Sequence, residues 1–263
     1  RFYLDPGHMA PMLYSQLALI GKYSLEELAQ LRQWGSPTTG HPEFEVARGI
    51  ENTSGPLGQG HVFAVGAAIA AKFLAAHTGN PTFAKETIYA YISDGGIQEE
   101  ISQGGARIAA TLGLDNLIMF YDSNDIQLST ETKDVMTEDT AAKYRALGWE
   151  VIEIVGNDAA QIRQALDAAL KVEGKPTLII GKCIMGKGAL KADGSSYEAN
   201  CKTHGAPLGG DAFTNTVKNL GGDPENPFQI FDDVKELYAN RAEELKTICD
   251  ARYAEEAEWA AAN

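Results

Sequence analysis

Two stretches decide the fold of this chain: Glu86-Thr-Ile-Tyr-Ala-Tyr-Ile-Ser93, followed by Asp94-Gly95-Gly96, and Asn116-Leu-Ile-Met-Phe-Tyr121, followed shortly by Asn124. Each apolar run is short and typical of a buried strand, and a helical pattern lies between them. Strand, glycine turn, helix and strand make a βαβ unit, whose right-handed crossover places the carboxyl ends of both strands side by side. We therefore expect Asp94 and Asn124 to lie close together at one edge of a parallel sheet.

The chemistry of this pair favours a hard cation. Mg²⁺ and Ca²⁺ prefer carboxylate and amide oxygens and take further ligands from a diphosphate and from water. Gly95 and Gly96 would let main-chain N–H groups approach a phosphate. Asp, Gly and Asn are also common in ordinary surface turns, so the pair alone leaves both interpretations open.

Alternating strand and helix patterns extend over most of the chain. We expect strands over 86–93, 116–121, 150–155 and 177–182, and helices over 24–34, 61–77, 97–113, 140–147, 158–172 and 228–262. Residues 36–56 and 184–210 lack periodicity and are predicted to be loops. Short apolar strands that alternate with helices predict an α/β fold, with a parallel sheet flanked by helices and ligands at its carboxyl edge.

Composition excludes several classes of function. The net charge of −14 argues against binding of nucleic acid or of an anionic membrane surface. No apolar run approaches the length of a membrane span. The three cysteines form no CxxC pair, which favours a reducing cytoplasm. No P-loop is present, and Gly55 to Gly60 does not have GxGxxG spacing, so a nucleotidase is disfavoured and a Rossmann dehydrogenase is a weak alternative.

Four further blocks occur in order around the Asp94/Asn124 unit. They are Phe2-Tyr-Leu-Asp-Pro-Gly-His8, Gly40-His-Pro-Glu-Phe-Glu45, Gly55-Pro-Leu-Gly-Gln-Gly60 and Thr203-His-Gly-Ala-Pro-Leu208. With these blocks, residues 1 to about 208 resemble the diphosphate-binding domain of transketolase. The family motif is usually Gly-Asp-Gly, and Ser93 replaces its first glycine here. We interpret residues 1–263 as one such thiamine-diphosphate-binding domain.

The resemblance implies a set of site residues. Asp94, Asn124 and the main-chain carbonyl of Ile126 would bind Mg²⁺ or Ca²⁺. The residues expected to line thiamine diphosphate are Gly55, Pro56, Leu57, Ser93, Asp94, Gly95, Asn124 and His204.

Four residues are implied to act in catalysis: His8, His41, His204 and Glu99. The histidines match family positions along the substrate channel, where imidazole can donate or accept protons near neutral pH. Glu99 matches a glutamate five residues after the motif aspartate, which in the family links to the activating glutamate of another domain across the dimer. A glutamate in the first turn of a helix is also favoured by the helix dipole, and Glu100 is its neighbour.

The implied activity is ketol transfer between phosphosugars by a homodimer. The family enzyme is longer, so we expect a pyrimidine-binding domain, in the same chain or in a separate subunit, and a C-terminal domain, and we expect the isolated chain to be inactive. Dihydroxyacetone synthase, another thiamine-diphosphate enzyme, and a non-catalytic N-terminal subunit of a split transketolase remain alternatives.

Overall fold

Five parallel strands form the centre of the computed structural model, which describes residues 1–263. The order across the sheet is β1-β2-β3-β5-β4. The strands are β1 (Phe2–Leu4), β2 (Ile88–Ser93), β3 (Leu117–Ser123), β4 (Glu150–Val155) and β5 (Thr177–Lys182). Because β2 and β3 pair in parallel with Ser93 opposite Asp122, the predicted βαβ unit is confirmed, and both strands end at the same edge.

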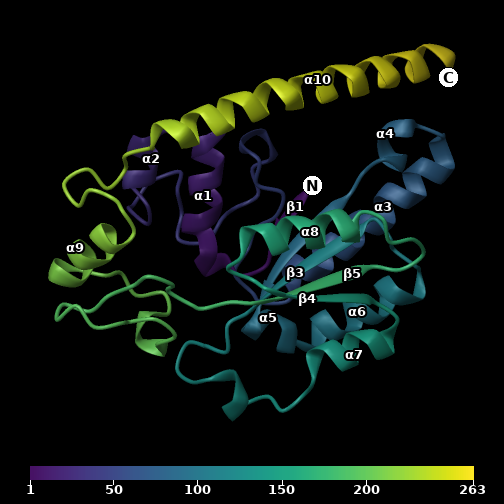
Figure 1. Cartoon of the computed structure of the whole chain (residues 1–263). Helices are drawn as coiled ribbons and strands as arrows, with labels where there is room; N and C mark the ends of the chain where they lie inside the picture. Colours follow the sequence, from purple (N-terminus) through teal and green to yellow (C-terminus); the bar gives the residue numbers. More distant parts are fainter.

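Helices cover both faces of the sheet (Figure 1). The helices are α1 (Ala10–Leu19), α2 (Leu25–Ala29), α3 (Gln59–Thr78), α4 (Pro81–Ala84), α5 (Asp94–Gln98), α6 (Glu100–Thr111), α7 (Thr140–Leu147), α8 (Ala159–Ala169), α9 (Gly210–Asn219) and α10 (Asp232–Ala262). Helices α3, α6 and α7 pack on one face and α8 on the other. The predicted α/β fold is therefore confirmed.

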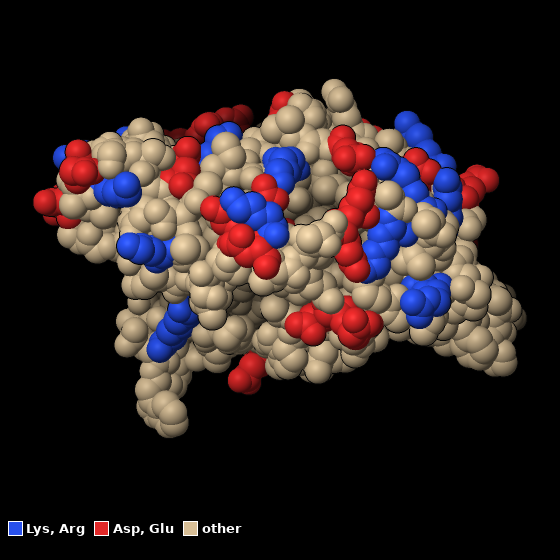
Figure 2. Space-filling view, turned by 90° about the horizontal axis from the view of Figure 1, so that it is seen from below, with Lys and Arg blue, Asp and Glu red and all other residues tan.

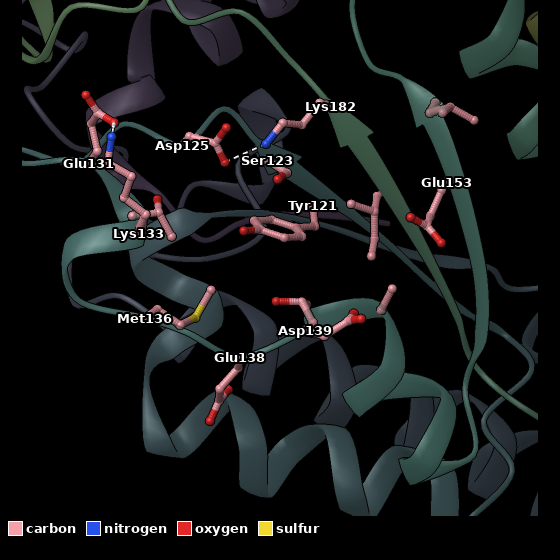
Figure 3. Close-up of a pocket in the computed structure, with 15 residues that line it drawn as sticks. Tyr121, Ser123, Asp125, Glu131, Lys133, Met136, Glu138, Asp139, Glu153 and Lys182 are labelled. Carbon is pink, nitrogen blue, oxygen red and sulfur yellow. Dashed lines mark hydrogen bonds and ion pairs between the residues drawn. The ribbon is translucent and has the colours of Figure 1, made fainter.

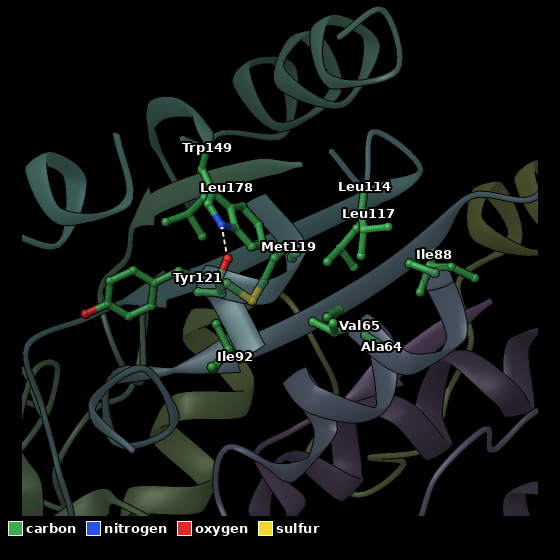
Figure 4. Packing of buried hydrophobic residues seen from close by; sticks show 14 of the residues in the cluster. Ala64, Val65, Ile88, Ile92, Leu114, Leu117, Met119, Tyr121, Trp149 and Leu178 are labelled. Carbon is green, nitrogen blue, oxygen red and sulfur yellow. Dashed lines mark hydrogen bonds between the residues drawn. The ribbon is translucent and has the colours of Figure 1, made fainter. Parts of the chain in front are cut away.

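Alternation along the strands explains this layering. In β2, Ile88, Ala90 and Ile92 are buried against α3 and α6, together with Leu117 and Met119 of β3 (Figure 4). Their neighbours in sequence point to the opposite face, as expected for a pleat with a period of two residues. Small residues of α3 let this helix approach the sheet closely. In the same core cluster, the Trp149 indole N–H donates a hydrogen bond to the Ala106 carbonyl at 2.9 Å.

Strand β1 was not predicted from the sequence. Three residues are too few to show periodicity, and β1 is defined by its pairing with β2. Its free edge is capped by the Asn52 amide, which accepts from the Leu4 N–H at 3.1 Å and donates to the Leu4 carbonyl at 3.0 Å. A side chain therefore satisfies main-chain groups that an edge strand would otherwise leave open.

Five of the six predicted helices have somewhat different bounds in the structure. The helix expected over 97–113 is two helices, because the backbone of Glu99 is extended (ψ 135°) between α5 and α6. The capping box at Ser24 and Glu27 is present, but α2 ends at Ala29 rather than near residue 34. The tail forms one helix, α10, of 31 residues.

Helix α3 is long and apolar enough to cross a membrane by length and composition alone, contrary to the expectation from the sequence. In this structure it contacts β1, β2 and α6, and Gly60, Ala64 and Ala68 are buried in those contacts. Its apolar composition therefore serves core packing here.

Candidate functional site

Asp94 and Asn124 meet at the carboxyl edge of the sheet, as predicted. The Asn124 main-chain N–H donates to Asp94 Oδ2 at 3.0 Å, and the Tyr121 hydroxyl donates to Oδ1 at 2.5 Å. Asp94 is almost completely buried. The Ile126 N–H donates to Asn124 Oδ1 at 3.0 Å, so the third predicted ligand residue belongs to the same turn.

The Asp94 carboxylate has no basic partner, which makes this site suitable for a cation. None of the ion pairs in the structure includes it. Burial raises its pKa, and the nearby Asp125 and Asp122 carboxylates raise it further. A buried carboxylate without a basic partner is strongly stabilised by a cation bound next to it. No cluster of three or more His, Cys, Asp or Glu side chains could hold a metal, so amide and main-chain oxygens would have to complete the site.

Glycines bring two loops together beside this carboxylate. Gly55 has φ 150° and Gly58, the N-cap of α3, has φ 84°, and both values suit glycine. A Cβ at Gly95 would lie 2.7 Å from Leu57 Cδ1, so the predicted cofactor residues Leu57 and Gly95 touch. Ser93 has extended backbone (φ −108°), so this position does not need the glycine of the family motif.

Asp5 links these loops, and sequence reasoning gave it no role. It follows β1, is fully buried, and its Oδ1 accepts from the Gly60 N–H at 2.9 Å. Its Oδ2 has no hydrogen-bond partner and would collide with a Cβ at Gly96. Burial raises its pKa, while main-chain N–H groups at the start of α3 lower it. A usable signal was its position, because an aspartate directly after a buried strand repeats the pattern of Asp94.

The three predicted histidines lie together near residues 55–58, which we call the glycine loop. The rings of His8 and His204 are 4.6 Å apart, and the His41 ring lies against Gly7 so closely that a Cβ there would collide with it. Burial lowers the pKa of His8 to about 4, with smaller contributions from His204 and His41. His204 Nδ1 is buried without a partner. The structure thus groups residues that are almost two hundred positions apart in sequence.

Glu99 lies next to the glycine loop, at the break between α5 and α6. Its Cβ would be 2.9 Å from a Cβ at Gly58, and its carboxylate is exposed. The extended backbone at Glu99 directs it toward this loop, whereas Glu100 is the first residue of α6. Pro56 is exposed on the same loop.

One hollow of the structure lies away from the histidines. It has a volume of about 550 Å³ and lies between β3, β4, β5 and the loop before α7 (Figure 3). Its lysines are already paired, Lys182 with Asp125 and Lys133 with Glu131. Asp125 therefore faces this hollow rather than Asp94. The face seen from below, where α5, α6 and α7 lie in Figure 1, carries acidic and basic side chains interspersed with one another (Figure 2).

Comparison with known proteins gives consistent results. A family model described as transketolase, thiamine diphosphate binding domain, matches residues 1–262. A transketolase of Staphylococcus epidermidis is 42% identical over 241 residues, which cover 90% of this chain and 36% of that protein. Transketolase 2 of Xanthobacter flavus is 39% identical over 245 residues, 92% of this chain and 35% of that protein.

Solved structures show the same fold. The transketolase of Leishmania mexicana superposes with a TM-score of 0.92 at 35% identity and covers 100% of this chain and 39% of that one. A Pichia stipitis transketolase in complex with sedoheptulose 7-phosphate has a TM-score of 0.91 at 35% identity, over 98% of this chain and 38% of that one. This chain therefore spans little more than a third of the length of these relatives. Because the family model matches nearly every residue and the fold agrees, the chain belongs to the transketolase family as a thiamine-diphosphate-binding domain.

Proposed function

We propose that this chain supplies the diphosphate- and cation-binding part of a transketolase, which transfers two-carbon ketol units between phosphosugars. The observation that carries the proposal is the buried Asp94 carboxylate, which lies beside Asn124 with no basic partner. Phosphosugars are proposed as substrates because related Pichia stipitis structures are complexes with xylulose 5-phosphate and sedoheptulose 7-phosphate.

Three residues would hold the cation, with Mg²⁺ as the first choice and Ca²⁺ as the second. Asp94 supplies the charge, and Asn124 and the Ile126 carbonyl supply neutral oxygens. Thiamine diphosphate, when bound, would supply a nucleophilic thiazolium carbon and a cationic ring that acts as an electron sink. The close contact of Leu57 with Gly95 supports a role for both loops in holding that cofactor.

The histidines would handle protons on the sugar. Burial keeps His8 neutral at pH 7, since its pKa is lowered to about 4, so it can accept a hydrogen bond from a sugar hydroxyl. His41 and His204 lie beside it and would form hydrogen bonds with carbonyl and hydroxyl oxygens of the sugar. Their shared position at one side of the glycine loop supports a common substrate channel.

The complete enzyme would need more than this chain. We propose that a pyrimidine-binding domain supplies the activating glutamate and that Glu99 faces it across a homodimer, consistent with the exposed Glu99 carboxylate. Two alternatives remain. A dihydroxyacetone synthase would differ from this proposal in the acceptor of the ketol unit, and a non-catalytic subunit of a split enzyme would bind the cofactor only together with a separate partner subunit.

Replacement of Asp94 tests the proposal. In the complete enzyme, Asp94→Ala should weaken Mg²⁺-dependent binding of thiamine diphosphate at least tenfold, about 1.4 kcal/mol, because the only charged ligand from the protein is lost. Isothermal titration calorimetry measures this directly. Asp125→Asn is the matched control, since it removes a neighbouring charge that pairs with Lys182 and tolerates the φ of 65° at this position. Equal affinity in Asp94→Ala and the native enzyme would refute the cation site.

A further inference from the structure

Asp122 is an acidic residue at the site. It has no assigned role as a cation ligand or in catalysis. It is the sixth residue of β3 and lies opposite Ser93 of β2. Its Oδ2 accepts from the Tyr91 hydroxyl at 2.9 Å, and its Oδ1 accepts from Asn124 Nδ2 at 3.2 Å. No lysine or arginine pairs with it. Its carboxylate therefore accepts hydrogen bonds from neutral donors and forms no ion pair.

These contacts fix which way the Asn124 amide points. Nδ2 donates to Asp122 Oδ1, while Oδ1 accepts from the Ile126 N–H. A flip of the amide would place its oxygen against the Asp122 carboxylate and its NH₂ group against the Ile126 N–H. Both contacts would then lose their hydrogen bond, because each would join two acceptors or two donors. The oxygen is thus held on the side away from Asp122.

Tyr91 anchors Asp122 from the neighbouring strand. Its ring stacks on Phe120, with centroids 5.3 Å apart and planes 17° apart. Cross-strand pairing of Tyr91 with Phe120 sets this stack, so the hydroxyl position follows from the register of β2 and β3. The hydrogen bonds from Tyr91 and from Asn124 to Asp122 therefore fix the Asn124 amide relative to the sheet.

We propose that Asp122 is a positioning residue that presents the Asn124 amide oxygen to the cation. The inference rests on the proposed function, since it assumes that Asn124 is a cation ligand. Residues that orient a metal ligand without touching the metal typically change metal affinity by about 10- to 100-fold. Asp122 would act through the orientation of the amide, and its negative charge would be secondary.

A set of variants in the complete enzyme separates these effects. Mg²⁺ is titrated by calorimetry into chelator-treated enzyme saturated with thiamine diphosphate. Asp122→Ala should weaken Mg²⁺ binding at least about tenfold. Asp122→Asn should retain most of the affinity, because its amide oxygen can still accept from Asn124 and its NH₂ group can donate to the tyrosine oxygen. Tyr91→Phe should fall between the two. Asp125→Asn removes a nearby charge without touching the Asn124 amide and should therefore lose less affinity than Asp122→Ala.

The possible results are distinguishable. If Asp122→Asn binds Mg²⁺ as weakly as Asp122→Ala, charge rather than orientation matters and the inference is wrong. It is also wrong if Asp122→Ala retains native affinity while Asp94→Ala loses it, and the proposed function would then stand. Native affinity in Asp94→Ala would instead overturn the proposed function. Should Asp122→Ala fail to fold, the Mg²⁺ affinities of the other variants decide the question. An affinity that falls from the native enzyme through Asp122→Asn to Tyr91→Phe supports the inference, and any other order overturns it.

Discussion

Replacing His61 with leucine should change how the stability of this chain depends on pH. His61 is fully buried in α3, and neither ring nitrogen has a hydrogen-bond partner. Its ring packs edge-on against Trp149, with centroids 6.2 Å apart. Burial without a partner penalises the charged imidazolium, so the pKa of His61 falls from 6.5 to about 4.

The size of the effect follows from this difference. Between the two pKa values the unfolded chain binds a proton that the folded chain does not, so stability is present above pH 6.5 and is lost as the pH falls toward 4. The full loss is about 3 kcal/mol, and about 2 kcal/mol of it should be lost by pH 5. Since the side chain is completely buried, solvent screening does not reduce this figure.

Urea unfolding at pH 7.5 and pH 5 measures the effect. The gain in unfolding free energy of His61→Leu over the native chain should be about 2 kcal/mol larger at pH 5 than at pH 7.5. Other groups with shifted pKa values, such as His8, cancel in this difference. His61→Gln is the matched control, because it removes the titration and keeps a buried polar group. It should show the same change with pH and a lower stability than His61→Leu at pH 7.5.

A gain that is equal at both pH values would refute the reasoning. It would mean that His61 titrates alike in the folded and unfolded states, and therefore that water or a hydrogen-bond partner reaches it. A pH effect in His61→Leu that is absent in His61→Gln would instead assign the effect to packing.

Three further predictions concern packing, the substrate channel and completeness. In urea unfolding, Gly60→Ala should lower the unfolding free energy by at least about 2 kcal/mol, because its Cβ would lie 2.5 Å from the Asp5 main chain. Gly66→Ala on the same helix is the control: its Cβ would meet nothing within 4 Å, so the change should be neutral or stabilising. In the complete enzyme, His41→Ala should leave cofactor affinity nearly native and reduce kcat/KM for the ketose donor about 10²-fold or more, while His204→Ala should impair cofactor affinity and turnover. Calorimetry and steady-state kinetics measure the two effects, and loss of cofactor binding in His41→Ala alone would contradict the placement of His41 in the substrate channel. The isolated chain should show no ketol transfer with saturating thiamine diphosphate and Mg²⁺, and a turnover near that of the complete enzyme would contradict the need for a pyrimidine-binding domain.

The sequence by itself determined the elements whose signals are local. Strands 150–155 and 177–182 and the helix over 140–147 have the predicted bounds, because short apolar runs and a helical period are properties of neighbouring residues. Asp94 and Asn124 were placed together because the two strands of a βαβ unit run parallel and end at the same edge of the sheet. The glycine and histidine blocks were found only through a family resemblance, since a lone histidine in a loop carries no signal of its neighbours.

The tertiary structure decided what depends on contacts between distant segments. Strand β1 exists because it pairs with β2 and has the Asn52 amide on its free edge. The order that places β5 between β3 and β4 could not be read from alternation, since every buried strand looks alike along the chain. Asp5 and Asp122 were likewise missed, because a carboxylate gains its role from the donors that fold around it. Local periodicity specifies which elements form, and long-range packing and hydrogen bonding specify which residues meet.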